Sequence, residues 1–241
     1  MKSVIFTKVK GLFLLCAALF ISAVVAEVSA VPLAEVTLSQ FESLVVEADM
    51  DINLVEVSEG EPLRMEYDLG DNDPSKFKVD VRRGVLKISQ PYNARSVSKI
   101  KATLYYNSAL SNIEIDRATA KFVTTFAAPI AQITVDDSAM LEGEVDCADL
   151  ELTAESNARL LLNGSCDYVL LKAKSAAKVE LRKLDTRSLE IEVSHGAAVA
   201  VACGERMKVS TSTSGVIKYW GEPTILRRSN KLISGSLQKQ D

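Results

Sequence analysis

Histidine, tryptophan and metal-ligand motifs are scarce in this sequence. Its 241 residues include a single histidine, His195, and a single tryptophan, Trp220. A Ser-His-Asp mechanism needs an imidazole to carry the proton, and His195 stands beside Gly196 in a predicted turn, where an exposed side chain is the simpler interpretation. The sequence also lacks a CxxC pair, zinc-type Cys/His spacing, calcium-binding Gly-Gly-x-Gly-x-Asp repeats and a Gly-rich phosphate loop. We therefore expect no catalytic residue, no bound metal and no cofactor.

The N-terminal segment 1–26 has the pattern of a secretory signal peptide. Lys2, Lys8 and Lys10 precede an apolar run from Gly11 to Ala26, after which we predict cleavage. The run is shorter than the roughly 20 residues that span a bilayer, so a retained anchor is the weaker alternative, and no integral membrane segment is expected after processing. The mature protein would then be periplasmic, held on the outer-membrane surface or extracellular.

Acidic residues outnumber basic ones. The whole chain has 28 Lys+Arg, 32 Asp+Glu and a net charge of -4. Removing residues 1–26 takes away three lysines and no acid, which makes the mature chain more acidic still. Nucleic acids and anionic lipids attract clustered cations, so neither is an expected partner.

Apolar and polar residues alternate with a period of two, and no helical period competes with this pattern. From Leu44 to Leu54 every second residue is apolar, and from Glu47 onward the residues between them are acidic or amide side chains. The same alternation returns over 63–69, 77–81 and 86–88. A period of two is typical of half-buried strands, so the sequence predicts an all-β fold.

From about position 113 the chain repeats. A small residue follows a short polar turn at five regularly spaced places: Ala139, Ala158, Ala177, Ala197 and Gly215. Each period is predicted to hold two strands and two turns. A unit of about 20 residues cannot bury an apolar face alone, so successive units must stack, each strand pairing with its counterpart one coil later. This pattern predicts a parallel β-solenoid.

The small residue at each repeat turn has a steric explanation. A tight turn requires either a positive φ or little side-chain bulk, which Gly, Ala, Ser and Asn permit. A bulky β-branched residue at these positions should distort the stack.

Three cysteines follow the predicted signal peptide, namely Cys147, Cys166 and Cys203. The step from Cys147 to Cys166 equals the step from Ala139 to Ala158, which places the two cysteines at one repeat position on neighbouring coils. Their Cα atoms would then lie about 5 Å apart, within the range of a disulfide. Either the two are bridged, or they stack as two small apolar side chains without a bond.

These features resemble the putative autotransporter adhesins with a head GIN domain, which occur largely in exported proteins of Bacteroidetes-like bacteria. The resemblance rests on Phe41–Leu54, Gly84–Ile88, the five repeat turns, and the closing Ser214–Pro223 followed by Ser234–Ser236. It implies a right-handed parallel β-helix, or solenoid, of pectin-lyase-like shape, and a role in cell adhesion. The sequence departs from the family in having alanine rather than glycine at four of the turns, which puts the tightness of those turns in question.

The predicted organisation is therefore a signal peptide over 1–26 and one head GIN-like solenoid domain over 34–241. Residues 34–110 supply N-terminal strands and a cap, and residues 111–241 form the repeat coils. The tail from Arg227 to Asp241 is expected to cover the other end. Because open solenoid ends expose unpaired strands, a homo-oligomer is a further expectation.

Several charged groups invite a catalytic interpretation. Asp136-Asp137 and the pair Glu142/Glu144 could supply the carboxylates of a polysaccharide lyase or hydrolase. Neighbouring strand residues point to opposite faces, so Asp136 and Asp137 converge only if a turn intervenes. A solvated turn and an outer strand face explain both pairs more simply. Arg227, Arg228 and Lys231 likewise fit solubilising charges at a coil end.

Aromatic residues concentrate at Tyr105-Tyr106 and Tyr219-Trp220. Tyr219 shares its parity with Ile217 and should face the core, which leaves Trp220 as the candidate ligand contact. The sequence thus favours an exported protein that binds a cell-surface glycan or protein through a rigid β-solenoid surface, without catalysis. The alternatives are a degenerate polysaccharide-active enzyme of pectin-lyase shape and a structural protein of the cell envelope.

Overall fold

The fold was obtained as a computed structural model, which describes residues 33–91, 98–229 and 235–241. These residues form eighteen β-strands and one short 3-10 helix, η1 (Pro74–Lys76). The strands of the first half are β1 (Ala34–Thr37), β2 (Ser43–Glu47), β3 (Met50–Glu56), β4 (Arg64–Asp68), β5 (Lys78–Arg82), β6 (Val85–Ser89), β7 (Ile100–Tyr106), β8 (Asn112–Asp116) and β9 (Thr119–Phe122). Those of the second half are β10 (Phe126–Asp136), β11 (Met140–Ala154), β12 (Arg159–Ala173), β13 (Lys178–Val193), β14 (Ala198–Ala202), β15 (Arg206–Thr211), β16 (Val216–Trp220), β17 (Ile225–Ser229) and β18 (Ser236–Lys239).

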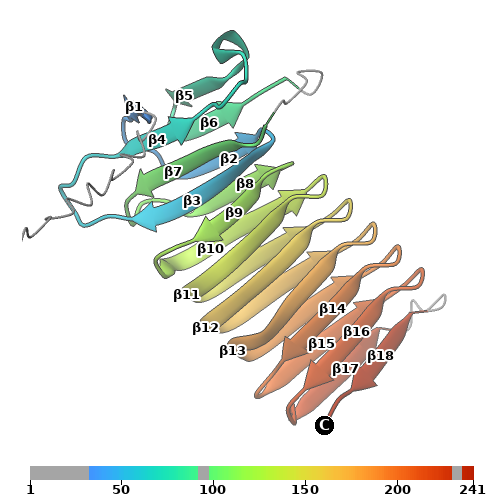
Figure 1. Ribbon diagram of the computed structural model, residues 1–241. Coiled ribbons are helices and arrows are strands. Elements are labelled where there is room, and N and C mark those ends of the chain that lie inside the picture. Colours follow the sequence, from blue (N-terminus) through green and yellow to red (C-terminus); the bar gives the residue numbers. More distant parts are fainter. Residues whose placement is uncertain (1–32, 92–97, 230–234) are drawn as a thin grey trace, which may run out of the picture. The chain divides into compact units, whose positions relative to one another are not determined.

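The strands stack as the coils of a parallel β-solenoid (Figure 1). We call β6-β2-β8-β10-β11-β12-β13-β15-β17 the first row and β7-β3-β9-β11-β12-β13-β14-β16-β18 the second row. Every neighbouring pair within each row is parallel. The long strands β11, β12 and β13 belong to both rows because each runs from one row into the other. The predicted all-β solenoid and its repeat are confirmed.

The register of the coils follows the repeat read from the sequence. One buried column in the second row consists of Leu141, Leu160, Val179, Val199 and Ile217, each opposite the next. Each of these residues comes two positions after a small turn residue, so the observed pairing steps equal the predicted spacings. The longest step, from Ala177 to Ala197, includes an extra residue, and a register shift opposite Leu161–Asn163 in the pairing of β12 with β13 accommodates it.

The tight turns are closed in the same way in all five coils, including the four with alanine. The N–H of Ala158 donates to the carbonyl of Glu155 at 2.8 Å, and the equivalent bonds at Ala139, Ala177, Ala197 and Gly215 measure 3.0 to 3.2 Å. The left-handed φ values fall on the two residues just before, such as Ser156 at 46° and Asn157 at 67°. The alanines themselves are fully buried. Their small size therefore serves packing under the turn, and alanine in place of glycine leaves the turn tight.

The prediction of a second turn in every period is wrong for the central coils. Residues 140–154 form one unbroken strand, as do 159–173 and 178–193. The chain instead bends at corners, where two successive side chains point outward, as Ala148 and Asp149 do. Parallel pairing on both sides continues through the bends, since β11 is paired with β12 from Met140 to Ala154 apart from one residue. True breaks do separate β9 from β10 at 123–125, β14 from β15 at 203–205, and β16 from β17 at 221–224.

The N-terminal part contributes parallel coils as well as an antiparallel cap. β2 lies between β6 and β8, and β3 lies between β7 and β9, so the earliest coil is inserted between two later ones. The cap itself is antiparallel: β4 pairs with β7, β1 with β4, and β5 with β6. No repeat spacing predicts this interleaving, because it depends on pairing between segments far apart in the chain.

At the other end, the tail continues the stack instead of lying across it. β17 pairs in parallel with β15, and β18 pairs in parallel with β16. The described strands of the tail that was expected to cover this end thus add a further coil to the stack.

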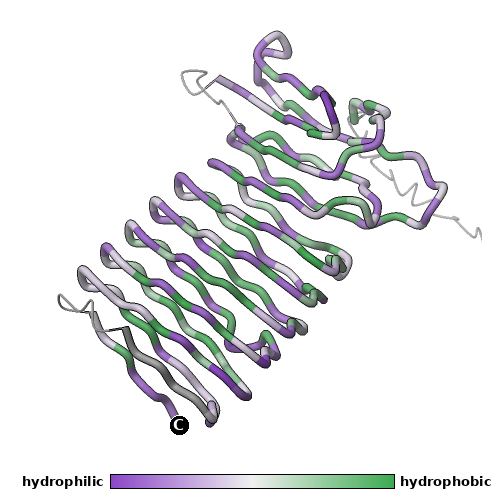
Figure 2. The backbone as a smooth tube through the Cα atoms, turned by 180° about the vertical axis from the view of Figure 1, so that it is seen from behind, coloured by the Kyte–Doolittle hydropathy of each residue, from purple (hydrophilic) through white to green (hydrophobic). Residues whose placement is uncertain are grey.

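Apolar and polar residues alternate along the strands, and polar residues gather at the turns (Figure 2). The interior between the two rows is apolar. Leucine, isoleucine, valine and alanine fill most of it. Phe122 and Phe126 stack at a ring-centroid distance of 4.9 Å where β9 leads into β10. Because each coil buries its apolar face only against its neighbours, the stack behaves as one continuous core.

Candidate binding surface

The outward face of the second row has an indentation along β14. Three alanines, Ala198, Ala200 and Ala202, point outward from this strand, and Val199 and Val201 between them are buried. The neighbouring strands carry longer side chains at the same register positions. Lys178 and Val216 flank Ala198 on β13 and β16. Glu180 and Lys218 flank Ala200 in the same way.

This indentation is a groove of about 510 Å³. We call it the alanine groove and define it by its floor and walls: Ala198 and Ala200, with Lys178, Glu180, Val216 and Lys218. Its lining continues across β12 and β11 to Arg159, Leu161 and Met140. Leu161 is 39% exposed, so this side of the groove offers an apolar surface.

Trp220 stands at one end of the alanine groove. It is half-buried and lies opposite Ala202 in the register of β14 with β16. The guanidinium carbon of Arg182 lies 5.0 Å from the centre of the Trp220 ring, a cation–π contact across Ala202. Tyr219 and Ile217 are buried, as their parity predicts, so the indole is the aromatic group of β16 on the outer face.

The extra residue between Ala177 and Ala197 contributes to this arrangement. Leu181 and Arg182 lie where β12 has the single residue Leu162, because Leu161 pairs with Glu180 and Asn163 pairs with Lys183. A bulge changes the direction of the side chains beside it. Arg182 is exposed at this point and reaches Trp220.

Positive charge around the alanine groove is not neutralised by neighbouring acids. Glu180 is paired with Arg182 at 2.6 Å. Lys178, Lys218 and Arg159 form no ion pair with any residue of the described ranges. Lysines on the first row differ, since Lys172 pairs with Glu151 at 2.9 Å and Lys208 with Glu190 at 2.6 Å.

The other aromatic pair does not form an open platform. Tyr106 is buried, and burial raises the pKa of its phenol far above the usual value. Tyr105 is half-buried, and the Arg64 guanidinium lies 3.7 Å from its ring centre. The Tyr105 hydroxyl donates to Glu66 Oε2 at 3.4 Å. Both rings are thus occupied by contacts within the protein.

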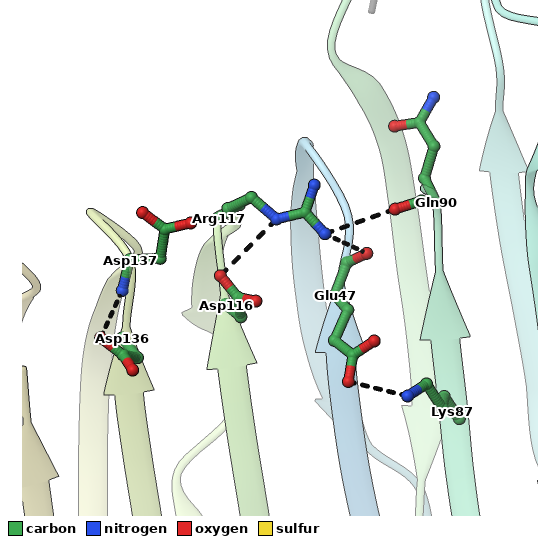
Figure 3. Close-up of polar contacts among 7 residues, drawn as sticks. All are labelled: Glu47, Lys87, Gln90, Asp116, Arg117, Asp136 and Asp137. Atoms are coloured by element: carbon green, nitrogen blue, oxygen red, sulfur yellow. Dashed lines mark hydrogen bonds and ion pairs between the residues drawn. The ribbon is translucent and has the colours of Figure 1, made fainter. Parts of the chain in front are cut away.

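The acidic residues at the turn edge do not converge as an acid and a base (Figure 3). Asp136 accepts a hydrogen bond from the backbone N–H of Asp137 at 2.7 Å, and Asp137 has the left-handed φ of a turn residue. Asp116 Oδ1 lies 3.6 Å from Arg117 Nε, and Arg117 Nη2 donates to the carbonyl of Glu47 at 2.9 Å. Burial raises the pKa of Asp116, and the neighbouring carboxylates add to this. These groups fix the turn edge to the N-terminal coils.

The remaining charged candidates are dispersed. Glu142 pairs with Lys121 at 2.9 Å, and Glu144 is exposed on its own. His195 is an exposed turn residue with a φ of 51°, its Nδ1 lying 3.0 Å from Ser194 Oγ. In the described part of the chain, no group of three or more His, Cys, Asp or Glu side chains is arranged to hold a metal ion. The side chains of Arg227 and Arg228, and all of Lys231, lie outside the described residues.

Cys147 and Cys166 occupy one column, as the spacing predicts, with Ala128 before them and Thr186 after them. All three described cysteines are buried free thiols. Burial raises the pKa of Cys166 to about 12 and also raises the pKa of Cys147 and Cys203. Cys166 Sγ lies 3.1 Å from the Tyr168 carbonyl. These thiols are packing groups of the core.

Sequence reasoning named Trp220 as a candidate contact but did not find the alanine groove or Arg182. The segment Ala198-Val199-Ala200-Val201-Ala202 does contain a signal, because alternation puts all of its alanines on one face. That signal becomes a groove only when the long side chains of both neighbouring coils are placed beside it. The predicted signal peptide, with Cys16 inside it, lies outside the described residues. Among the helices that the structure describes, none has the length and apolar character needed to cross a bilayer.

Comparison with known proteins agrees with this architecture. A crystal structure of a putative adhesin from Bacteroides fragilis superposes with a TM-score of 0.79 at 17% identity, covering 86% of this chain and 96% of that one. A putative adhesin from Parabacteroides merdae gives a TM-score of 0.70 at 12% identity, with 87% and 95% covered. A protein from Parabacteroides distasonis described as a putative lipid binding protein gives 0.65 at 14% identity, with 87% and 96% covered. These likenesses establish the shared fold.

No protein with a curated description matches the chain. The family comparison, in contrast, matches residues 40–223 to the family described as putative auto-transporter adhesin, head GIN domain. The matched range runs from the residue before Phe41 to Pro223, so it includes the interleaved N-terminal coils, all five repeat turns and Trp220. The chain belongs to the putative auto-transporter adhesin, head GIN domain family.

Proposed function

We propose that this protein is an exported adhesin that binds a cell-surface glycan or protein through the outer face of its second row, without catalysing a reaction. The observation that carries the proposal is the half-buried Trp220 beside the alanine groove. An aromatic ring next to a depression, on a surface that does not have to fold upon binding, can contribute contact area at a low entropic cost. Family membership supports adhesion as the class of function.

The solenoid supports binding by being rigid. The outward side chains of β14 and β16 sit on strands paired on both sides, so the spacing between contacts is fixed by the approximately 4.8 Å separation of strands. A preorganised surface loses less conformational entropy on binding than a set of loops. The expected export, with the mature protein in the periplasm, on the outer-membrane surface or outside the cell, would place this face where surface molecules occur.

Two other functions make different predictions. A polysaccharide-active enzyme needs an acid and a base that converge on one bond. Asp136, Asp137, Glu142 and Glu144 do not converge in this way, because Asp136 accepts a hydrogen bond from the backbone of Asp137 and Glu142 pairs with Lys121. A structural envelope protein needs no ligand, so that function would not explain a tryptophan beside unpaired cations. Adhesion accounts for the second-row face more fully than either.

The test is a glycan and matrix-protein array probed with the mature protein, Trp220→Ala, and Tyr168→Ala as a matched control. Tyr168 is an exposed aromatic on β12, outside the alanine groove. We expect binding that Trp220→Ala weakens and Tyr168→Ala leaves unchanged, with no turnover of any bound glycan. Absence of all binding would favour the structural role, and turnover would favour the enzyme. Cell fractionation with an antibody to the mature chain tests export, since retention in the cytoplasm contradicts it.

A further inference from the structure

We propose that the alanine groove binds a single strand of an acidic polysaccharide, with its sugar rings over the alanine floor and its anionic groups beside the lysines of the walls. This inference rests on the proposed binding function and names its ligand class and site. Extent, charge and backbone pairing each support it from a separate observation.

The extent of the groove suits one extended chain. Its lining runs across five neighbouring strands, from Met140 on β11 to Val216 on β16. Four strand spacings amount to roughly 19 Å, a length that several sugar units of an extended chain can follow. The alanines provide depth because they replace longer side chains at outward positions.

The charge of the groove selects an anionic ligand. Lys178 and Lys218 face each other diagonally across the floor, one on each wall, and Arg159 extends the positive surface onto β12. None of the three has an ion-pair partner within the described residues. The chain as a whole has a net charge of -4, so this concentration of unpaired cations runs against the overall composition. Carboxylates or sulfates carried on a sugar chain would supply the missing partners.

The end of the groove provides a stacking group. Arg182 lies over Trp220 at 5.0 Å, and its Nε is paired with Glu180 Oε1 at 2.6 Å, so the indole and the guanidinium hold each other in place. An aromatic side chain held in one orientation presents its surface without losing rotamer freedom on binding. A sugar ring at this end would lie against the Trp220–Arg182 pair while the rest of the chain follows the floor.

Backbone pairing argues for a glycan over an acidic peptide. An extended peptide gains most of its affinity by adding a strand to an open sheet edge. β14 is paired with β13 on one side and with β16 on the other, so it offers no open edge at the floor. A glycan requires no such edge, because its hydroxyl and anionic groups bind to side chains.

The test measures binding by isothermal titration and biolayer interferometry with four probes: alginate and heparin as acidic glycans, dextran as a neutral glycan and poly-glutamate as an acidic peptide. We expect alginate or heparin to bind, more weakly as salt rises, and dextran and poly-glutamate to bind at least about tenfold less tightly. If poly-glutamate bound equally well, the groove would recognise negative charge alone, and the proposal would be overturned.

Variants locate the site. Lys178→Glu combined with Lys218→Glu should weaken acidic-glycan binding at least about tenfold, and Ala200→Tyr should do so by filling the floor. The matched controls, Lys101→Glu on β7 and Ala127→Tyr on β10, change exposed residues outside the groove and should leave binding unchanged. All of these side chains are solvent-accessible, and circular dichroism checks the fold. If the groove variants bind as the wild type does, the proposal is wrong.

The glycan and matrix-protein array that tests the proposed function distinguishes a failure of this inference from a failure of the proposed function. Binding of a neutral glycan or a protein, with no binding of alginate or heparin, overturns the acidic-glycan inference and leaves adhesion intact. Absence of binding in every arm overturns both.

Discussion

Cys147 and Cys166 lie opposite each other in the parallel pairing of β11 with β12, and both are free thiols. They belong to a buried column in which Ala128 precedes them and Thr186 follows. Small side chains recur in this column because it lies beside the corner where the strand bends. We infer that the two side chains pack in this column without a covalent bond.

We expect all three described cysteines to alkylate when the unreduced mature protein is unfolded in iodoacetamide, giving three adducts by mass spectrometry. The folded protein should react far more slowly at pH 8, because the thiols are buried and only the thiolate attacks. Burial raises the pKa of Cys166 to about 12, so almost none of it is ionised at that pH. A single adduct without reductant and three adducts with reductant would instead establish a disulfide, and peptide mapping that finds the single adduct on Cys203 would assign it to Cys147 and Cys166.

Replacing Asp116 by asparagine should stabilise the protein at pH 7. Burial, followed by the charges of nearby carboxylates, raises the pKa of Asp116 in spite of Arg117. The unfolded chain therefore loses this proton at a lower pH than the folded protein, so stability falls as pH rises from the ordinary value of 3.8 through the raised pKa. With the carboxyl 31% exposed, we expect a gain on the order of 0.5 kcal/mol at pH 7.

Urea unfolding at pH 7 and at pH 3 checks this prediction. The advantage of Asp116→Asn should disappear at pH 3, where the carboxyl is protonated in both states. Asp149→Asn, an exposed change on β11, is the control and should have little effect at either pH. A loss of stability at pH 7 would mean that the attraction to Arg117 outweighs burial and repulsion.

The features of the fold that could be predicted are those that depend on a pattern within one segment or on a constant repeat length. Alternation over Leu44–Leu54 predicts a strand because the period of two is visible within the segment. The step from Cys147 to Cys166 predicts stacking because the repeat has a constant length there. The position of β2 and β3 between later coils depends on pairings such as Ser43 with both Val85 and Asn112, which no local pattern contains.

The candidate site was predictable only in part, for a related reason. The parity of Tyr219 and Trp220 is a property of one strand, and it correctly placed Tyr219 in the core. The groove depends on three strands at once, with Ala200 between Glu180 and Lys218. The contact of Arg182 with Trp220 depends in addition on a bulge. The longer step between repeat turns shows that an extra residue exists without showing where it is placed.

Replacing Ala158 by valine should destabilise the solenoid by about 1–3 kcal/mol, because Ala158 is fully buried beneath the turn and two additional methyl groups have no space without displacing a neighbouring coil. The free energy of urea unfolding measures the effect. Ala127→Val, at an exposed strand position of β10, is the control and should change stability by less than about 0.5 kcal/mol. Equal stability of the two variants would show that the turn adapts to bulk, contrary to the steric explanation.

Replacing Gly164 by alanine should be the most damaging small change in the stack. Gly164 lies at a corner of β12 with a φ of 113°, and a Cβ added there would come within 2.1 Å of the Val145 carbonyl oxygen on β11. A backbone atom cannot move aside as a flexible side chain can, so the two strands must separate. Since β11 and β12 are paired through this corner, we expect a loss of about 3 kcal/mol or more in the free energy of unfolding.

Gly204→Ala is the matched control for this glycine. A Cβ at Gly204 would meet the Thr186 carbonyl oxygen at 3.6 Å, an ordinary contact, and its φ lies outside the left-handed region. Alanine also restricts the unfolded chain, so this variant should be neutral or stabilised by up to about 1 kcal/mol. If Gly164→Ala unfolds at the same urea concentration as Gly204→Ala, the corner of β12 tolerates a side chain. The close approach of β11 to β12 would then not be what requires glycine there.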